Sequence, residues 1–243
     1  MAYWGETMTS THAIWNQDDP AAARAALAKL AATPQQRTDK AGTARERAYL
    51  DAAEQLFGSG TLKERDTAFL KATEALAQAY PDDDDAQLFH ALALLGVTRG
   101  ERNVPNYLHA ADIAKRVYAR NPRHPGAVHY WIHGMDDPEH AAGALEAAHT
   151  LSKIAPNAGH AQHMTSHIFM ALGMWDEVVA SNESAIAVVR SFRRSRTTST
   201  FWARSRRAPS RSNRGRSMQP CPPPAKPPNA ATCCHSISAR RRR

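Results

Sequence analysis

The chain matches itself when it is shifted by 34 residues. Pro122 and Pro156 stand at this interval. The same shift superposes three further pairs of identical residues: Ala127 on Ala161, His129 on His163, and His133 on His167. A repeat of this length, with a proline closing each unit, is typical of helix-turn-helix units that stack into a solenoid. We therefore expect two clear repeats, at residues 122–155 and 156–189.

The second half of each unit supports this prediction. Residues 173–188, GMWDEVVASNESAIAV, contain a Gly-x-aromatic-Asp-Glu turn, and small residues follow where two helices would pack closely: Ala144, Ala148 and Ala185. With the segments AYWGE, HYWIHGMDDPEHA and HAQHMTSHIFMALGMWDE, the chain resembles a tetratricopeptide repeat (TPR) protein of a bacterial subgroup. The resemblance covers residues 1–189. It implies an all-α domain, a right-handed α-solenoid of TPR-like helical hairpins, which serves as a protein- or peptide-binding scaffold.

The rest of the body agrees with an all-α domain. Apolar residues recur at helical spacing, and no window shows a convincing alternation of period two. The stretch STHAIWNQDD is expected to be a loop, ended by an Asp19 cap with Pro20 at the first helical position. The opening MAYWGETM resembles the middle of a helix, and the resemblance implies a further helix before it in relatives. We therefore expect the chain to be truncated at its start.

The last 60 residues differ sharply from the body. Residues 184–243 contain 14 Arg, one Lys and no carboxylate, so their net charge is +15. Because the whole chain has a net charge of +8, residues 1–183 have a net charge of −7. Residues 190–243 have no apolar period and are rich in Arg, Pro and Ser, which predicts a disordered basic C-terminal tail. Such a tail would bind nucleic acid through its phosphates. A shifted reading frame in GC-rich DNA would also produce this composition, and we favour that explanation.

Cysteine usage and hydropathy limit the expected compartment. All three cysteines, Cys221, Cys233 and Cys234, lie in the tail, so the body forms no disulfide. No apolar run approaches the ~20 residues that a membrane span needs, and the N-terminus does not have the form of a secretory signal. We expect a cytoplasmic protein by default, although a thiol-free helical body would also suit a periplasm.

Histidines gather on two of the predicted helices. His129, His133 and Asp136 have i, i+4, i+7 spacing, and His160, His163 and His167 have i, i+3, i+7 spacing, so each set shares one helix face. Neighbouring helices pack about 8–10 Å apart. The TPR pattern places these residues on the concave groove, so imidazoles from both helices are expected to converge there.

Three interpretations of this histidine-rich groove stay open. The imidazoles could hydrogen-bond one another, Asp136 and Ser166 in a purely structural polar groove. They could bind a protein or an extended peptide. They could also ligate a divalent transition metal such as Zn, Cu or Fe through four rings: His129, His133, His163 and His167.

Catalytic patterns are weaker. The HEXXH pattern is absent, because Tyr, Trp and Ile separate His129 from His133. The segment MDDPEH could supply an acid and a base from Asp136, Asp137, Glu139 and His140. Asp137-Pro138-Glu139 is also an ordinary helix start, and we favour that interpretation. Ser166 adjoins His167 on a different helix face, so the pair does not form a nucleophile and its base. The sequence therefore predicts a binding scaffold rather than an enzyme, with a His-ligated metal-binding protein or metalloenzyme as the alternative.

The remaining aromatic and sulfur side chains are expected to be structural. Phe169 and Trp175 should pack between helices and Trp131 in the core. Met164, Met170 and Met174 have helical spacing and are expected to fill the core rather than to form a copper-thioether site, although Met170 could face the groove. Five scattered histidines receive no role: His12, His90, His109, His124 and His149.

Overall fold

Threonine capping boxes set the starts of three helices in the N-terminal half. Thr33, Thr43 and Thr61 each accept a hydrogen bond from the backbone N–H three residues on, and the Gln or Glu at that position bonds back to the threonine N–H. Asp19, Asp83 and Asn103 cap three more helices with a side-chain oxygen. These bonds satisfy backbone donors that would otherwise lack a partner at a helix N-terminus, and the predicted Asp19 cap is confirmed.

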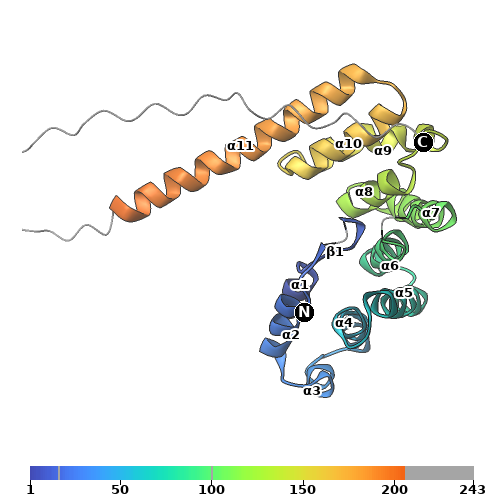
Figure 1. The fold of residues 1–243 in the computed structure, drawn as a ribbon, viewed down its shortest axis with the longest axis vertical. Coiled ribbons are helices and arrows are strands. Elements are labelled where there is room, and N and C mark those ends of the chain that lie inside the picture. Colours follow the sequence, from blue (N-terminus) through green and yellow to red (C-terminus); the bar gives the residue numbers. More distant parts are fainter. Residues whose placement is uncertain (16, 100, 206–243) are drawn as a thin grey trace, which may run out of the picture. The chain divides into compact units, whose positions relative to one another are not determined.

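The computed structural model describes residues 1–15, 17–99 and 101–205, and these are almost entirely helical (Figure 1). The α-helices are α1 (Ala2–Met8), α2 (Pro20–Leu30), α3 (Pro34–Asp39), α4 (Ala44–Phe57), α5 (Leu62–Ala79), α6 (Asp84–Gly96), α7 (Val104–Arg120), α8 (Pro125–Gly134), α9 (Leu145–Ile154), α10 (Gly159–Ala171) and α11 (Trp175–Ser205). Residues Met1–Ser199 form one compact unit. Among the described helices, none is at once long enough and apolar enough to cross a membrane.

Successive helices pack as hairpins. α4 contacts α5, α6 contacts α7, and α8 contacts α9. The first helices of neighbouring hairpins also contact each other, α6 with α8 and α8 with α10. α8 and α10 begin 34 positions apart, at Pro125 and Gly159, so the repeat in the sequence is a repeat in space. The all-α array of TPR-like hairpins is confirmed for the described residues.

Small residues let these helices approach closely. The largest apolar cluster lies among α7 to α10 and combines alanines with large buried residues such as Ile132, Met164 and Ile168. Gly134 ends α8 against α7, and a Cβ there would lie 2.6 Å from the carbonyl oxygen of Tyr107. Because real Cβ atoms do not approach backbone this closely, only glycine allows the present packing of α8 on α7.

The N-terminal stretch that was expected to be a loop is instead a small ribbon. β1 (Thr11–His12) pairs antiparallel with β2 (Gln17–Asp18), and the 3-10 helix η1 (Ala13–Trp15) joins them. The Thr11 hydroxyl donates to the Asp18 carboxylate at 2.7 Å, a short-range pairing of side chains that the composition of the stretch did not reveal. The ribbon also packs on α6, because Gly96 leaves room for the Ala13 methyl group: a Cβ on Gly96 would lie 2.6 Å from it.

An arginine fixes this ribbon to the helical body. Arg99 donates to Asp18 at 2.5 Å and to both carboxylate oxygens of Asp66 on α5, at 2.5 and 2.7 Å. All three side chains are largely buried. Arg99 adopts a positive φ of 32°, a conformation that costs energy in a residue with a side chain. The ion pairs hold Arg99 in this position, and through Asp18 they hold the ribbon.

Several smaller expectations were wrong. Trp175 does not pack between helices but is 64% exposed at the start of α11, and Met170 is 54% exposed rather than part of the core. Phe169, Met164 and Trp131 are buried as predicted. α11 continues to Ser205, past the predicted domain end at residue 189. Residues 206–243 lie outside the described part of the chain, and so does most of the predicted tail.

Candidate metal centre

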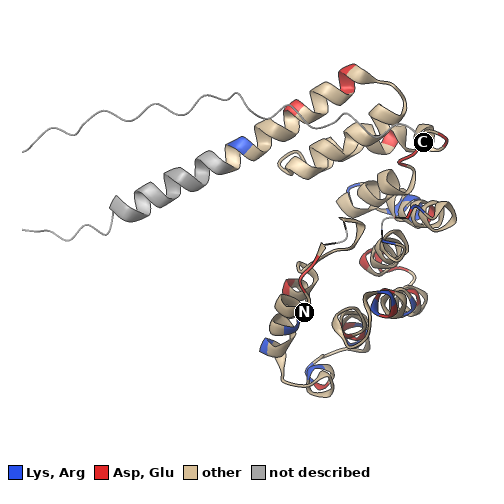
Figure 2. Ribbon diagram, in the orientation of Figure 1, with Lys and Arg blue, Asp and Glu red and all other residues tan. Residues whose placement is uncertain are grey.

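Histidines from α8 and α10 meet where these two helices contact. His129 and His133 lie one turn apart on α8, and α10 contributes His160, His163 and His167. The ring centroids of His129 and His160 are 4.9 Å apart, and those of His133 and His167 are 6.4 Å apart. Neither helix contains Lys, Arg, Asp or Glu, and Figure 2 shows both in tan along their length. Apart from the phenol of Tyr130 on α8, imidazoles are therefore the titratable groups that these two helices bring together.

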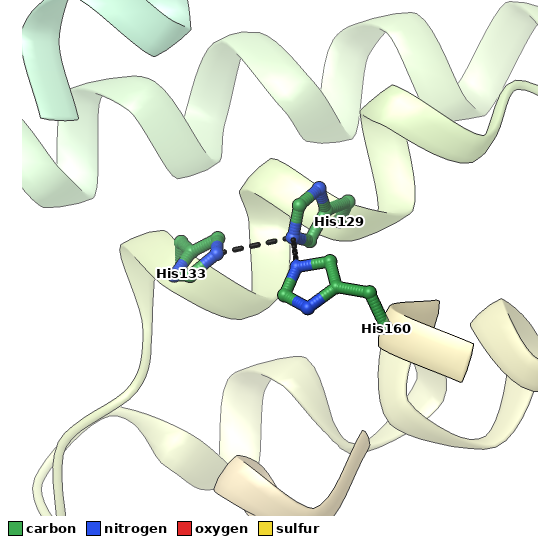
Figure 3. A group of neighbouring side chains, drawn as sticks. All are labelled: His129, His133 and His160. Atoms are coloured by element: carbon green, nitrogen blue, oxygen red, sulfur yellow. Dashed lines mark hydrogen bonds between the residues drawn. The ribbon is translucent and has the colours of Figure 1, made fainter. Parts of the chain in front are cut away.

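Three of these rings converge through the same type of atom. His129 Nε2 lies 3.1 Å from His133 Nε2 and 3.1 Å from His160 Nε2 (Figure 3). All three ligand nitrogens lie within 4.8 Å of one another. We call His129, His133 and His160 the histidine trio. It joins two helices, because His160 reaches across from α10 to the two residues of α8.

The spacing of the trio is compatible with metal ligation as well as with hydrogen bonding. A neutral imidazole nitrogen has either one hydrogen or one lone pair, so His129 Nε2 makes a full hydrogen bond with only one of its two neighbours. Zinc–nitrogen bonds of 2.0–2.1 Å in a tetrahedron place ligand nitrogens about 3.3 Å apart. The two 3.1 Å separations are close to this value. The third, between His133 and His160, is bounded at 4.8 Å, so a metal ion would have to draw these two rings together.

Burial and mutual repulsion lower the pKa of each ring of the trio. Burial lowers the pKa of His129 to about 3, and repulsion from His160 and His167 adds to the effect. Burial likewise holds the pKa of His133, which is 7% exposed, well below its usual range, with repulsion from His129 as the next cause. The pKa of the more exposed His160 is lowered too, by partial burial and then by His163. Neutral imidazole is the form that binds a metal.

The other two rings form a pair with fixed outer partners. His167 Nδ1 lies 2.7 Å from an oxygen of Asp136, and His163 Nδ1 lies 2.7 Å from Asn182 Oδ1. The Asn182 amide nitrogen donates to the carbonyl of Val178 at 2.8 Å, which fixes the orientation of the amide. Because both outer partners are acceptors, both Nδ1 atoms must carry the hydrogen.

This assignment leaves two lone pairs facing each other. His163 Nε2 and His167 Nε2 lie 3.3 Å apart, and neither has a hydrogen to share when both rings are neutral. Such an arrangement is relieved by one added proton or by a cation between the rings. We call His163 and His167 the histidine pair. Hydrogen bonds from a ring to a carboxylate or an amide oxygen are also the usual way in which proteins orient metal-binding imidazoles.

The end of α8 differs from the prediction. Asp136 was expected on the same helix face as His129 and His133, but α8 ends at Gly134 and Asp136 lies beyond it. Arg102 secures this end, since its guanidinium donates to the carbonyl of Gly134 at 3.1 Å and to Asp137 at 2.6 Å. Asp136 is thus presented to His167 by a turn rather than by helical periodicity.

The acidic turn after α8 is structural. Asp137 accepts hydrogen bonds from the backbone N–H groups of Glu139 and His140 at 3.0 Å, and it bonds the His140 ring at 2.8 Å. Its hydrogen bonds with His140 and Arg102 lower its pKa against the opposing effect of burial. The turn leads into η2 (Ala141–Ala144), so α9 starts later than the Asp-Pro-Glu motif suggested. These bonds give the Asp137 carboxylate a structural role, so its presence requires no catalytic one.

The nitrogens that lie closest together differ from the predicted metal set. That set was His129, His133, His163 and His167, whereas the convergent atoms belong to His129, His133 and His160. His160 was predicted as a groove residue, and it lies in the trio. Sequence reasoning assigned no role to His12 or Asn182. A single histidine more than a hundred residues from the repeats, and one asparagine in a polar helix, carry no pattern that would have identified them.

A cavity of about 480 Å³ adjoins the trio. All three histidines line it, together with Tyr130 of α8 and residues of α1, α6 and the N-terminal ribbon. Trp15 of the ribbon meets His160 edge to face, with ring centroids 5.0 Å apart. The ring centroids of His12 and Trp15 are 5.5 Å apart. The site is thus assembled from segments far apart in the sequence.

Comparisons with known proteins add little to this geometry. No family model matches the sequence, and no curated protein matches it. A solved structure titled "MamA MSR-1 C2" is similar over 78% of this chain and 94% of its own length, with a TM-score of 0.49 and 14% sequence identity. A likeness of this degree does not extend to function.

Proposed function

We propose that the protein binds a divalent transition metal, with zinc as the leading candidate, through His129, His133 and His160. The observation that carries the proposal is the convergence of three Nε2 atoms, with two separations of 3.1 Å. Three imidazoles suit Zn, Cu, Ni or Fe(II). Carboxylate-preferring ions such as Mg and Ca are disfavoured, because α8 and α10 carry no carboxylate.

The environment of the trio favours loading at neutral pH. Metal ligands must be deprotonated, so affinity usually falls as the histidines take up protons. The pKa of His129, lowered to about 3, keeps this ring available far below neutrality. Three protein ligands leave one position of a tetrahedral ion open, which is the arrangement of catalytic rather than purely structural zinc sites. A hydrolytic metalloenzyme is therefore compatible with the site, although no side chain is assigned as its general base.

Metal competition tests the proposal. Purified chain, first stripped with a chelator, is titrated with Zn²⁺ against a chromophoric chelator and its metal content is measured. We expect one tightly held ion per chain, and a loss of affinity of at least about a hundredfold in His129→Ala, because one of three ligand bonds is removed. His109→Ala is the matched control, since His109 is an exposed histidine on the neighbouring helix α7. Equal Zn²⁺ affinity in both variants would contradict the proposal.

Peptide or protein binding is the second candidate. It is supported by the contacts of α6, α8 and α10 in series and by the exposed rings of His160 and His163 along α10. Flat polar rings offer donors, acceptors and stacking surfaces to an extended chain. Selection from a displayed peptide library, with and without chelator, tests this function. Peptides that bind the chelator-treated wild type and are lost in a His160→Ala, His163→Ala double variant with unchanged helical circular dichroism would support it.

A further inference from the structure

The cavity beside the trio has an uncharged wall. Its lining residues are Trp4, Gly5, Met8, Thr9, Thr11, His12, Ala13, Ile14, Trp15, Phe89, Leu92, His129, Tyr130, His133 and His160. Among these described residues, none is Lys, Arg, Asp or Glu. A charged group enters such a space only at a large desolvation cost, so the lining selects against ionic ligands and favours an apolar one.

The aromatic part of the wall is held in place by contacts of its own. Trp4 donates its indole N–H to the carbonyl of Tyr49 at 3.0 Å, and its ring meets Tyr49 and Phe89 edge to face, each with centroids 5.2 Å apart. Phe89 in turn meets Tyr49 at 6.1 Å. Because these rings are locked together, the cavity is largely preformed, and a ligand does not have to order its walls on binding.

The N-terminal ribbon also lines the cavity. Ala13, Ile14 and Trp15 contribute to the lining, and the ribbon is fixed by the Gly96 contact and by Arg99 through Asp18. Trp15 lies against His160. An apolar space and a three-nitrogen cluster therefore share one wall, and the shared residues are those of the trio.

We propose that this cavity binds a compact, uncharged, largely apolar molecule with one nitrogen or oxygen donor, which completes the coordination of the metal held by the trio. The proposal rests on the proposed metal function. A volume of about 480 Å³ suits a small aromatic molecule. The metal would bind the donor atom of the ligand, and the aromatic wall would contact its apolar remainder. The ligand would then bury no polar group without a partner.

A pair of matched probes tests the proposal. The chain is loaded with Co²⁺, whose visible spectrum reports a new donor, and is titrated separately with imidazole and with 4-phenylimidazole. Both probes offer the same donor, but only the second has a ring to bury. We expect 4-phenylimidazole to bind at least about tenfold more tightly, as burial of a phenyl ring predicts.

Two variants test whether the phenyl ring of 4-phenylimidazole binds in the cavity. Leu92→Trp, which fills the cavity, should remove most of the difference between the probes while leaving the spectral response to imidazole intact. Val179→Trp, on the exposed face of α11, should preserve the difference. Equal affinity of wild type for the two probes, or a preference that survives Leu92→Trp, would overturn the cavity proposal alone. Absence of any Co²⁺ spectrum in wild type would overturn the metal function and the cavity proposal with it.

Discussion

The histidine trio and the histidine pair use the same side chain in opposite ways. In the trio, three Nε2 atoms converge and burial lowers the pKa of the rings. In the pair, Asp136 and Asn182 fix both rings from the outside through Nδ1, and the two Nε2 atoms face each other at 3.3 Å. The rings of the trio contact one another through Nε2, whereas the rings of the pair are also held from outside by hydrogen bonds through Nδ1. This difference predicts that the three rings of the trio determine metal affinity. Asp136 and Asn182 should instead determine the orientation of the two rings of the pair.

Metal affinity should separate the two groups most strongly. We expect His133→Ala to weaken Zn²⁺ binding by at least about a hundredfold, because a ligand is lost, and His167→Ala to weaken it by about tenfold or less, because His167 acts from outside the trio. Competition with a chromophoric chelator measures both. If His167→Ala cost as much as His133→Ala, the metal would lie across both groups and the distinction between trio and pair would fail.

Substitution of Gly134, which ends α8, should affect the trio by displacing α8 from α7. Gly134→Ala puts a methyl group where backbone of α7 lies within 2.6 Å, and overpacking of this kind typically costs about 1–3 kcal/mol. We expect a lower midpoint of thermal unfolding and weaker Zn²⁺ binding. Gly5→Ala is the matched control, because a Cβ at Gly5 meets nothing within 4 Å. Unchanged stability in Gly134→Ala would show that α8 and α7 can move apart without cost.

The pH dependence of stability should report the trio. In metal-free protein the folded pKa of His129 is about 3 and that of His133 is also lowered, whereas the unfolded chain titrates near 6.5. Below pH 6.5 the unfolded state therefore binds protons that the folded state does not. The free energy of unfolding should fall as pH falls, by up to about 1.4 kcal/mol per pH unit for each such ring.

Urea unfolding at pH 7.5, 6.5, 6.0 and 5.5, with a chelator present, measures this slope above the range in which most carboxylates titrate. A His133→Leu variant should show a shallower slope. A slope that is identical in this variant and in wild type would mean that His133 titrates normally in the folded chain.

Changes to the outer partner of the pair should have the smallest effect on Zn²⁺ affinity. They should nevertheless change the tautomer of His163, which is visible by spectroscopy. Long-range ¹H–¹⁵N correlation spectra of metal-free protein above pH 7.5 should show His163 and His167 with the hydrogen on Nδ1. Asn182→Asp keeps the acceptor and should preserve the tautomer of His163, whereas Asn182→Leu removes the acceptor and should mix the two tautomers. Zn²⁺ affinity should change by no more than about threefold in either variant. A hydrogen on Nε2 of His163 in wild type would contradict the assignment.

The sequence predicted the helices of this site well and its nitrogens less well. The 34-residue shift correctly paired α8 with α10, because repeated hairpins stack with their first helices in contact. The same shift superposes His129 on His163, yet His129 Nε2 meets His160, three residues earlier. Equivalent positions in a repeat need not lie opposite each other, since side chains lean along the helix and neighbouring helices are offset.

The cavity could not be anticipated from the repeat. Its wall combines α8 and α10 with Trp4, Trp15 and Phe89, which come from α1, η1 and α6. No local pattern connects the N-terminal ribbon with the repeats; the connection depends on the Arg99 ion pairs and on the close approach of Ala13 to Gly96. Tertiary contacts of this kind leave no periodic trace in a single sequence.

X-ray absorption spectroscopy of the zinc-loaded chain tests the central claim most directly. We predict three imidazole nitrogens at about 2.0–2.1 Å and one further light-atom donor, with one imidazole lost in His160→Ala. Zinc that is absent after supplementation, or that keeps the same imidazole shell in His160→Ala, would contradict the account.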